Sequence, residues 1–344
     1  MRVLVTGHKG YLGAVLTSVL RHAHHEVAGL DCDLYGDCDF GRVRDPIDGF
    51  DCDIRGIEAA DLAQFDAVIH LAALPDDPAG LLTPTLIQEV NAGATFRLAH
   101  RCREAGVARL IFASTCAVYG SRGGEWLREE AAPRPVTAYA KSKLLAEAAV
   151  SQLASDAFAP VHLRLGTLYG MSPRMRVDTV VNDFVGAAVT SGRVGMKTQG
   201  WAWRPFVHVQ DVARAILETL KAPRELVCNE VFNVVNSHSN CRVIDVADRV
   251  AELVPNCARL ASTGVTDLLS YRVSGDKFAG AFPNFRWRYD LSEGIRQLRC
   301  GYDNAGLTHG EWRSDRYRRA MRLAAMVERG QIDLTLPAMH TTAA

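Results

Sequence analysis

Short apolar runs and longer amphipathic segments alternate along the first half of the chain. Residues 2–6 (RVLVT) and 26–31 (EVAGLD) have the character of strands, and residues 11–23 between them place apolar side chains at helical spacing. The alternation continues with strands expected at 66–73, 109–114 and 160–166 and helices expected near 85–105 and 137–155. Parallel strands need crossover helices of this length, which then cover both faces of the sheet. The pattern therefore predicts an α/β fold with a doubly wound parallel sheet.

Beyond about residue 170 the expected elements become shorter, and loop-rich segments separate them. We expect a first domain at 1–170 that is joined by parts of 200–240, a smaller mixed α/β lobe at 171–300 and a helical extension at 301–344. In the extension Trp312, Met321 and Leu323 can line one face of a helix, which predicts a packing role for it.

The composition excludes several classes of partner. The chain carries 39 basic and 39 acidic side chains that are interspersed, so we expect neither nucleic acid nor a membrane surface and favour a small polar substrate. The opening apolar run is too short to cross a bilayer and does not have the pattern of a signal peptide, and the nine cysteines are odd in number. These features favour the cytoplasm and free thiols. Cys32, Cys38 and Cys52 lack short paired spacing with histidines, so no metal site is expected.

A glycine-rich turn lies where the first expected strand gives way to the first expected helix. Gly7, Gly10 and Gly13 follow one another at intervals of three in TGHKGYLG, so backbone N–H groups can approach a pyrophosphate at the helix N-terminus. The spacing is G-x-x-G-x-x-G rather than G-x-G-x-x-G, but Asp31 ends the second strand where a ribose-binding carboxylate is expected. The alternative is a plain glycine turn with a capping Asp. Together the features predict a dinucleotide site.

Asp31 also bears on which dinucleotide is bound. A carboxylate there accepts hydrogen bonds from both adenosine ribose hydroxyls and repels a 2′-phosphate, so NAD is favoured over NADP. Lys9 is open to two interpretations, as a residue that reaches a phosphate or as one exposed to solvent, and we favour exposure.

Tyr139 and Lys143 are four residues apart in YAKSK, which places both side chains on one face of a helix. A phenol has an ordinary pKa of about 10 and is a poor base at neutral pH unless a cation stabilises its phenolate, and Lys143 is placed to do this. Taken alone, the pair is also compatible with an ordinary helix surface. Here it follows FASTCAVYG (112–120) at the end of an expected strand, which favours a catalytic pair.

Five segments, in this order, resemble the extended short-chain dehydrogenases/reductases that modify nucleotide-diphosphate sugars: TGHKGYLG, DAVIHLAA, FASTCAVYG, YAKSK and RPFVHVQDVA. The resemblance is to the NAD-dependent sugar-nucleotide epimerase/dehydratase family, with the UDP-galactose 4-epimerases nearest in pattern, and it covers about residues 1–300. It implies a Rossmann-type NAD-binding domain followed by a substrate-binding lobe. It also implies a homodimer formed by the helix near 91–104 and the Tyr/Lys helix.

The resemblance implies a role for each matching position. Thr115 bonds the sugar oxygen, Tyr139 is the general acid/base and Lys143 its electrostatic partner. Asp53 and Ile54 lie at the adenine, Leu71 to Ala73 pass beneath the cofactor, and Asn91 fixes the strand that carries Thr115. The implied cofactor-binding residues are Gly7, Gly10, Tyr11, Leu12, Gly13, Asp31, Asp53, Ile54, Leu71, Ala72, Ala73, Asn91, Tyr139 and Lys143. The implied substrate-binding residues are Thr115, Thr167, Asn182, Arg204 and Asp267, of which Arg204 carries the guanidinium fork that suits a phosphate.

One departure from the family pattern narrows the chemistry. Members that dehydrate or decarboxylate the sugar have an acid just after the catalytic Thr or Ser, whereas this chain has Cys116 and Ala117. Of the family's reactions, those that oxidise or reduce a single carbon remain: epimerisation at C4, or NAD(P)H-dependent reduction of a 4-ketosugar. Asp31 favours epimerisation because it favours NAD. A non-catalytic NAD-binding regulatory protein is a third alternative.

Other departures leave the sugar and the nucleotide base open. Thr167 replaces an Asn of many members, and Gly264 stands where the 4-epimerases often carry an Arg near Asp267. Cys116 lies three residues before Tyr119, whereas related enzymes place a catalytic Cys two residues before it, so we interpret Cys116 as a packed thiol. We interpret His208 as a structural residue.

Overall fold

The computed structural model describes residues 1–40, 46–76, 80–262, 264, 266 and 269–333. Its main sheet has seven strands in the order β11-β7-β5-β4-β1-β2-β3, all of them parallel. These strands are β1 (Arg2–Thr6), β2 (Glu26–Asp31), β3 (Gly49–Asp51), β4 (Ala67–His70), β5 (Arg109–Thr115), β7 (Ala159–Leu165) and β11 (Val231–Val234). The prediction of a doubly wound parallel sheet is confirmed.

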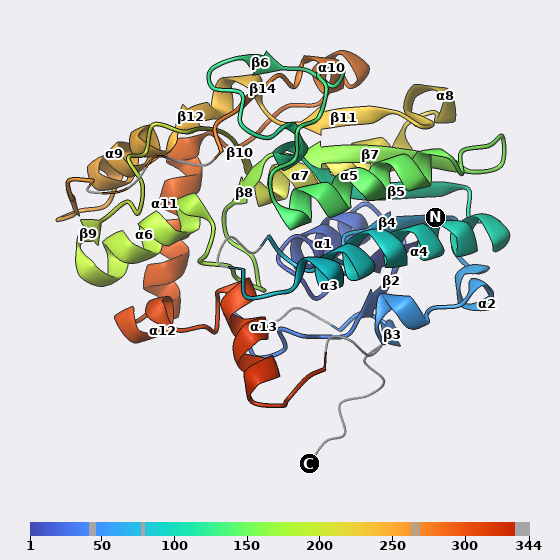
Figure 1. The fold of residues 1–344 in the computed structure, drawn as a ribbon, viewed down its shortest axis with the longest axis horizontal. Coiled ribbons are helices and arrows are strands. Elements are labelled where there is room, and N and C mark those ends of the chain that lie inside the picture. The colour runs from blue at the N-terminus through green and yellow to red at the C-terminus, as the bar shows by residue number, and fades with distance from the viewer. Residues whose placement is uncertain (41–45, 77–79, 263, 265, 267–268, 334–344) are drawn as a thin grey trace.

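Helices cover both faces of this sheet (Figure 1). On one face lie α1 (Gly13–His22) and α7 (Val209–Lys221), and on the other α3 (Pro84–Gln88), α4 (Ala94–Glu104) and α5 (Ala138–Ser151). A π-helical turn at Glu89–Gly93 joins α3 to α4.

The side chains of each strand alternate between the two faces. Val3 and Val5 enter the core beneath α1 and α7, whereas Leu4 enters the core beneath α4 and α5. Because both faces are buried, the central strands are almost uniformly apolar, which is the pattern that made them visible in the sequence.

The second lobe has mostly short strands, but its longer helices are as long as those of the first domain, which differs from our expectation of shorter elements. Its helices are α6 (Val180–Ser191), α9 (Val243–Leu253), α10 (Asp276–Ala281), α11 (Leu291–Ala305) and α12 (His309–Arg313). Its strands form small sheets, with β8 (Thr167–Tyr169), β10 (Trp203–His208) and β12 (Asn240–Arg242) in one, β9 (Arg193–Val194) and β13 (Ala258–Arg259) in another, and β6 (Trp126–Leu127) and β14 (Arg272–Val273) in a third. The chain then forms α13 (Arg319–Glu328). The remaining short helices are α2 (Ala59–Leu62), α8 (Arg224–Val227) and the 3₁₀ turns Ile54–Gly56, Cys116–Tyr119 and Ser237–Ser239.

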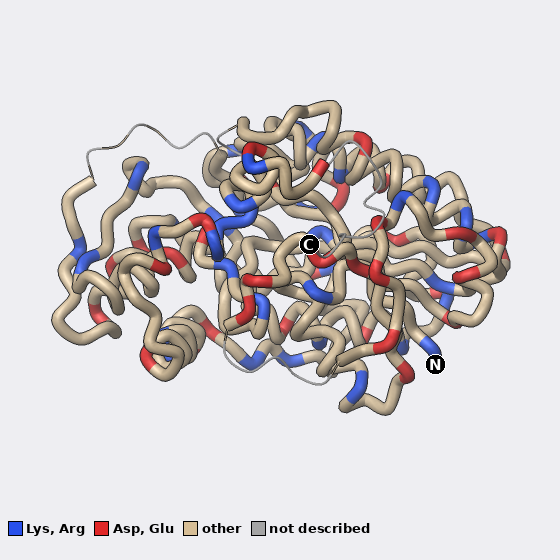
Figure 2. Tube along the Cα trace, turned by 90° about the horizontal axis from the view of Figure 1, so that it is seen from below, with Lys and Arg blue, Asp and Glu red and all other residues tan. Residues whose placement is uncertain are grey.

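Charged side chains and cysteines are spread along the chain rather than grouped in one segment. Figure 2 shows the two signs of charge interspersed along the chain. All nine cysteines are free thiols. Among the described residues, no His, Cys, Asp or Glu cluster of three or more is placed to hold a metal ion, and no helix has the length and hydropathy needed to span a membrane.

Candidate active site

The glycine turn follows β1 and is shaped by close backbone contacts. Gly7 has a φ of +73°, and its N–H donates to the Leu30 carbonyl at 2.8 Å. A Cβ on Gly7 would lie 2.7 Å from the Ala72 nitrogen, and one on Gly13 would lie 2.1 Å from the Gly7 oxygen. Only glycine fits at these two positions. The turn thereby brings α1 against the end of β4, and α1 begins without a side-chain cap on its first N–H groups, which suits a pyrophosphate.

Asp31 lies at the end of β2, beside the glycine turn. Its carboxylate accepts the backbone N–H groups of Lys9 and Asp33, both at 2.9 Å, and burial raises its pKa. We expected Lys9 to be exposed, but it is paired: its Nζ lies 2.6 Å from an Asp51 oxygen and 3.5 Å from an Asp33 oxygen. Arg174 contacts Asp33 from the second lobe at 2.9 Å. Carboxylates therefore line the ribose end of the site, and the residues present fit a dinucleotide without a 2′-phosphate.

The other residues assigned to the cofactor have partners within the protein. Asp53 caps the turn at Ile54–Gly56 and forms an ion pair with Arg55 at 2.8 Å. Ile54 is buried. The segment Leu71 to Ala73 follows directly after β4. Its Ala72 backbone packs on Gly7, and the Ala72 N–H donates to Thr6 Oγ1 at 3.3 Å.

The Asn91 amide bonds the segment after β4 and, among the described residues, has no hydrogen bond to β5, so its position differs from our expectation. It is fully buried in the π-helical turn, where its Oδ1 accepts the Leu74 N–H at 2.7 Å and its Nδ2 donates to the Leu74 carbonyl at 3.1 Å. Its amide thus fixes the segment that passes beneath the cofactor site, because it satisfies both polar groups of one buried residue.

Lys143 and Tyr139 of α5 lie beside the end of β5, the strand that carries Thr115. Thr115 ends β5, and its Oγ1 accepts the Ala117 N–H at 3.1 Å. Lys143 lies one turn beyond Tyr139 with its Nζ 5.8 Å from the Tyr139 ring centre, and it donates to the Ala113 carbonyl at 2.8 Å. Lys143 is 2% exposed, and burial lowers its pKa to about 7.

The charges around Tyr139 include two that the sequence analysis missed. Burial raises the pKa of the Tyr139 phenol, the negative charge of Asp76 raises it further, and the positive charge of Arg176 lowers it. Arg176 forms an ion pair with Asp178 at 2.8 Å. Both arginines of the segment SPRMRVD, Arg174 and Arg176, therefore border the site. The sequence carried no clear signal for them, because this polar segment lies in the loop-rich part of the chain beyond about residue 170.

A buried polar network joins the ends of the strands next to Thr115 and Lys143. Ser114 donates to Glu147, which forms an ion pair with Arg164 at 2.8 Å. Arg164 donates to the Tyr119 hydroxyl at 3.0 Å, and that hydroxyl donates to Asn233 at 2.8 Å. The network joins the ends of β5, β7 and β11 to α5, so it fixes the strand end that presents Thr115.

Cys116 and His208 have the structural roles that we expected. The Cys116 thiol is fully buried and donates to the Arg164 carbonyl at 3.2 Å, and burial raises its pKa. His208 caps α7, pairs with Gln297 at 2.7 Å and stacks on Tyr289. Burial lowers the pKa of His208 to about 4.

In the second lobe Arg204 and Thr167 both contact Tyr271. Arg204 donates to the carbonyls of Trp203 and Leu269, and its guanidinium lies 5.3 Å from the Tyr271 ring centre. Thr167 shares a hydrogen bond with Tyr271, which lies close enough to Tyr139 to raise the pKa of that phenol. Two of the expected substrate-binding residues are thus linked to Tyr139 through one tyrosine.

Asn182 differs from our expectation of a diphosphate contact. It is fully buried, its Oδ1 accepts the Gly170 N–H at 3.0 Å, and its Nδ2 donates to the Tyr11 hydroxyl at 3.1 Å and the Arg176 carbonyl at 2.8 Å. It therefore ties the glycine turn to the second lobe. Asp267 lies outside the described residues.

Gly264 allows a close approach between two chain segments. A Cβ there would lie 2.3 Å from the Lys197 carbonyl oxygen. An Arg at this position would need the backbone to move, so the departure from the family pattern goes with the local fold.

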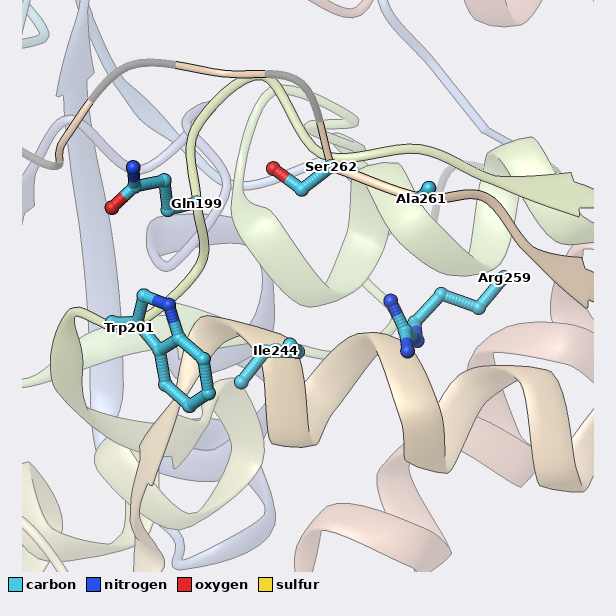
Figure 3. Close-up of a pocket in the computed structure, with 6 residues that line it drawn as sticks. All are labelled: Gln199, Trp201, Ile244, Arg259, Ala261 and Ser262. Carbon is cyan, nitrogen blue, oxygen red and sulfur yellow. The ribbon is translucent and has the colours of Figure 1, made fainter.

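A separate cavity of about 510 Å³ lies in the second lobe (Figure 3). Trp201 and Ile244 lie on one side of it, and Arg259 and Ser262 come from the segment at β13 and beyond. None of Thr115, Tyr139 and Lys143 lines this cavity, so it is distinct from the candidate active site.

Comparisons with known proteins agree with this geometry. The family described as NAD dependent epimerase/dehydratase matches residues 3–234. The UDP-glucose 4-epimerase of Streptomyces lividans is 27% identical over 273 residues, which are 72% of this chain and 80% of that protein. The dTDP-D-glucose 4,6-dehydratase of Mus musculus is 25% identical over 264 residues, which are 74% of this chain and 73% of that protein. The structure of MoeE5 in complex with UDP-glucuronic acid and NAD is 27% identical with a TM-score of 0.77, over 89% of this chain and 100% of that one.

Proposed function

The chain belongs to the NAD-dependent epimerase/dehydratase family, and from this premise we propose that it epimerises a nucleotide-diphosphate sugar at C4. The sugar is oxidised transiently at C4, and the hydride returns to its opposite face. The observation that supports this most strongly is the position of Lys143, beside the Tyr139 ring and bonded to the end of β5 that carries Thr115. Cys116 and Ala117 follow Thr115 where a dehydratase carries its acid.

Each residue has a defined part in this reaction. When bound, NAD would accept the hydride from C4 of the sugar and would donate it back to the same carbon. Tyr139, as its phenolate, takes the proton of the C4 hydroxyl and later returns it to the product. Because both the proton and the hydride return to the sugar, no net redox change occurs. Arg176 lowers the pKa of the phenol against the opposing effect of burial. Thr115 holds the sugar oxygen by a hydrogen bond, and Arg204 binds the diphosphate.

Two other reactions differ from this one in their products. A ketosugar reductase consumes one NAD(P)H for each product molecule. A dehydratase needs a second acid, and Asp76 is a carboxylate close enough to Tyr139 to raise its pKa. Glu147 is engaged with Arg164 and Ser114. The assay below therefore includes products of both kinds.

The proposed substrate class is tested by incubating the NAD-loaded protein with a panel of nucleotide-diphosphate sugars in ordinary and in deuterated water. We expect one pair of C4 epimers to interconvert to equilibrium, with no deuterium bound to carbon and no net change in NADH, as followed by NMR and absorbance. Deuterium at C3 or C5, a 4-keto-6-deoxy product, or stoichiometric use of NAD(P)H would contradict epimerisation at C4.

We also propose a homodimer in which α4 and α5 of each copy pack together. Phe96 on α4 is 40% exposed and Leu145 on α5 is 48% exposed, so this pair of helices presents large apolar side chains to solvent. Burying them against a second copy removes this apolar surface from water.

A further inference from the structure

Helix α13 lies against the candidate active site although it follows the second lobe in sequence. In Figure 1 it lies beneath α3, and its Leu323 is fully buried in one apolar cluster with Ile87 of α3. We define the strap as residues 315–328, which are α13 and the four residues before it.

The strap is fastened to the loop that follows Asp31. The Arg319 guanidinium carbon lies 4.0 Å from the ring centre of Tyr35. Arg316 Nε donates to the Asp37 carbonyl at 2.7 Å, and Arg322 forms an ion pair with the Asp37 carboxylate. This loop carries Asp33 and begins at the expected ribose-binding residue, so these contacts hold the adenosine end of the site.

The strap is also fastened to the segment that carries Arg174 and Arg176. Arg319 Nη2 donates to the carbonyls of Arg174 at 3.1 Å and Met175 at 3.2 Å, and the Arg319 N–H donates to Asp178 at 2.9 Å. Asp178 is the ion-pair partner of Arg176, the cation that acts on Tyr139. One side chain therefore connects both charged borders of the site.

Arg319 is unusual in its own surroundings. It is 3% exposed, and its Nη1 is buried without a hydrogen-bond partner among the described residues. A buried guanidinium with an unused donor is costly, so its presence calls for an explanation. Burial lowers its pKa, and its charge reaches the phenol of Tyr11 in the glycine turn. The unused donor lies on a cation near the turn that suits a pyrophosphate.

The apolar side of the strap reaches the catalytic end. Leu323 is buried with Leu74 and Ile87, and Tyr35 and Tyr139 pack against the same cluster. A dinucleotide that extends from Asp31 to Tyr139 has the strap packed at both of its ends.

We propose that the strap is part of the NAD site: pinned by Arg319, it closes over the bound dinucleotide and slows its release. Arg319 is a positioning residue, because it acts through Tyr35, Arg174 and Asp178. The proposal rests on NAD binding and not on the epimerisation. If the protein binds NAD but epimerises no sugar, the same test still applies.

The test is the rate at which radiolabelled NAD leaves the loaded full-length protein when unlabelled NAD is added in excess. We expect Arg319→Ala to raise the release rate about tenfold or more, since it removes charged hydrogen bonds. Arg319→Lys should restore part of the retention because it keeps the charge and one donor. The matched control is Arg329→Ala, which removes an exposed arginine just beyond α13 and should leave the rate unchanged.

Amide hydrogen exchange on the unaltered protein provides a second measurement that does not depend on how a variant folds. We expect exchange within residues 319–328 to slow when NAD is added. The proposal would be overturned if Arg319→Ala released NAD at the rate of the unaltered protein. It would also be overturned if amide exchange in this helix were the same with and without NAD.

Discussion

Tyr139→Phe is expected to lower kcat by about 10²- to 10⁴-fold, which is the usual contribution of a positioned general acid/base. The ring remains, so its packing with Leu74 and Leu323 is kept, and only the proton-carrying oxygen is lost. NAD binding and the thermal unfolding midpoint should stay close to those of the unaltered protein. The measurement is the initial rate of epimer formation, together with NAD binding by calorimetry.

Tyr289→Phe is the matched control for this substitution. It also removes one tyrosine hydroxyl, which in this case bonds Gln210 at 2.7 Å, and it keeps the stacking on His208. Activity in Tyr139→Phe equal to that of the control would exclude Tyr139 as the acid/base. It would favour the non-catalytic NAD-binding protein considered from the sequence.

Lys143→Met is expected to remove a large pH dependence of stability from the NAD-free protein. Burial lowers the pKa of Lys143 to about 7 in the folded state, against about 10.4 in an unfolded chain. Between these two values the unfolded state holds a proton that the folded state lacks, so the free energy of unfolding rises with pH across this window. The contribution is on the order of 3 kcal/mol between pH 7 and pH 10. Below pH 7 both states hold the proton, and the slope from Lys143 vanishes.

Urea unfolding at several pH values measures this difference. The free energy of unfolding of the unaltered protein minus that of Lys143→Met should rise from pH 7 to pH 10. Lys141→Met removes an exposed lysine from the same helix and is expected to show no such rise. If the curves of the unaltered protein and Lys143→Met run parallel, Lys143 is not the buried cation described above.

The sheet could be predicted from the sequence because its signal is local. Strands that are buried on both faces read as apolar runs, and the helices between them have their own period, so β1, β2, β4, β5 and β7 were all expected. The three-residue β3 was missed because so short a strand carries no pattern. Asp51 of β3 is the partner of Lys9. Because β3 was not predicted, this partner was not foreseen and we expected Lys9 to be exposed.

Motifs in the sequence were enough to name the candidate residues, whereas contacts that join distant residues could not be predicted. The family and its cofactor NAD are confirmed. The hydrogen bonds of Asn91 and Asn182 depend on which backbone groups the fold leaves unpaired beside them, and this cannot be seen before the fold is known. The same holds for Glu147 and Arg164, although a lone arginine in an apolar strand was a visible signal.

The C-terminal extension shows the same limit. Its expected packing role is consistent with the burial of Leu323, but Met321 is 48% exposed and the partners of α13 lie some 240 to 290 residues earlier, at Leu34, Leu74 and Leu82. Nothing in the sequence of the extension points to the active site. Only the fold brings it there.

Transient oxidation at C4 is tested most directly with a substrate that carries deuterium on that carbon. The sugar nucleotide that the panel identifies is prepared with deuterium at C4 and turned over in ordinary water with unlabelled NAD in solution. Epimerisation by hydride return predicts that the product epimer keeps the deuterium at C4, as read by mass spectrometry and NMR. Product that has lost this deuterium to the solvent or to free NAD would contradict the proposed reaction.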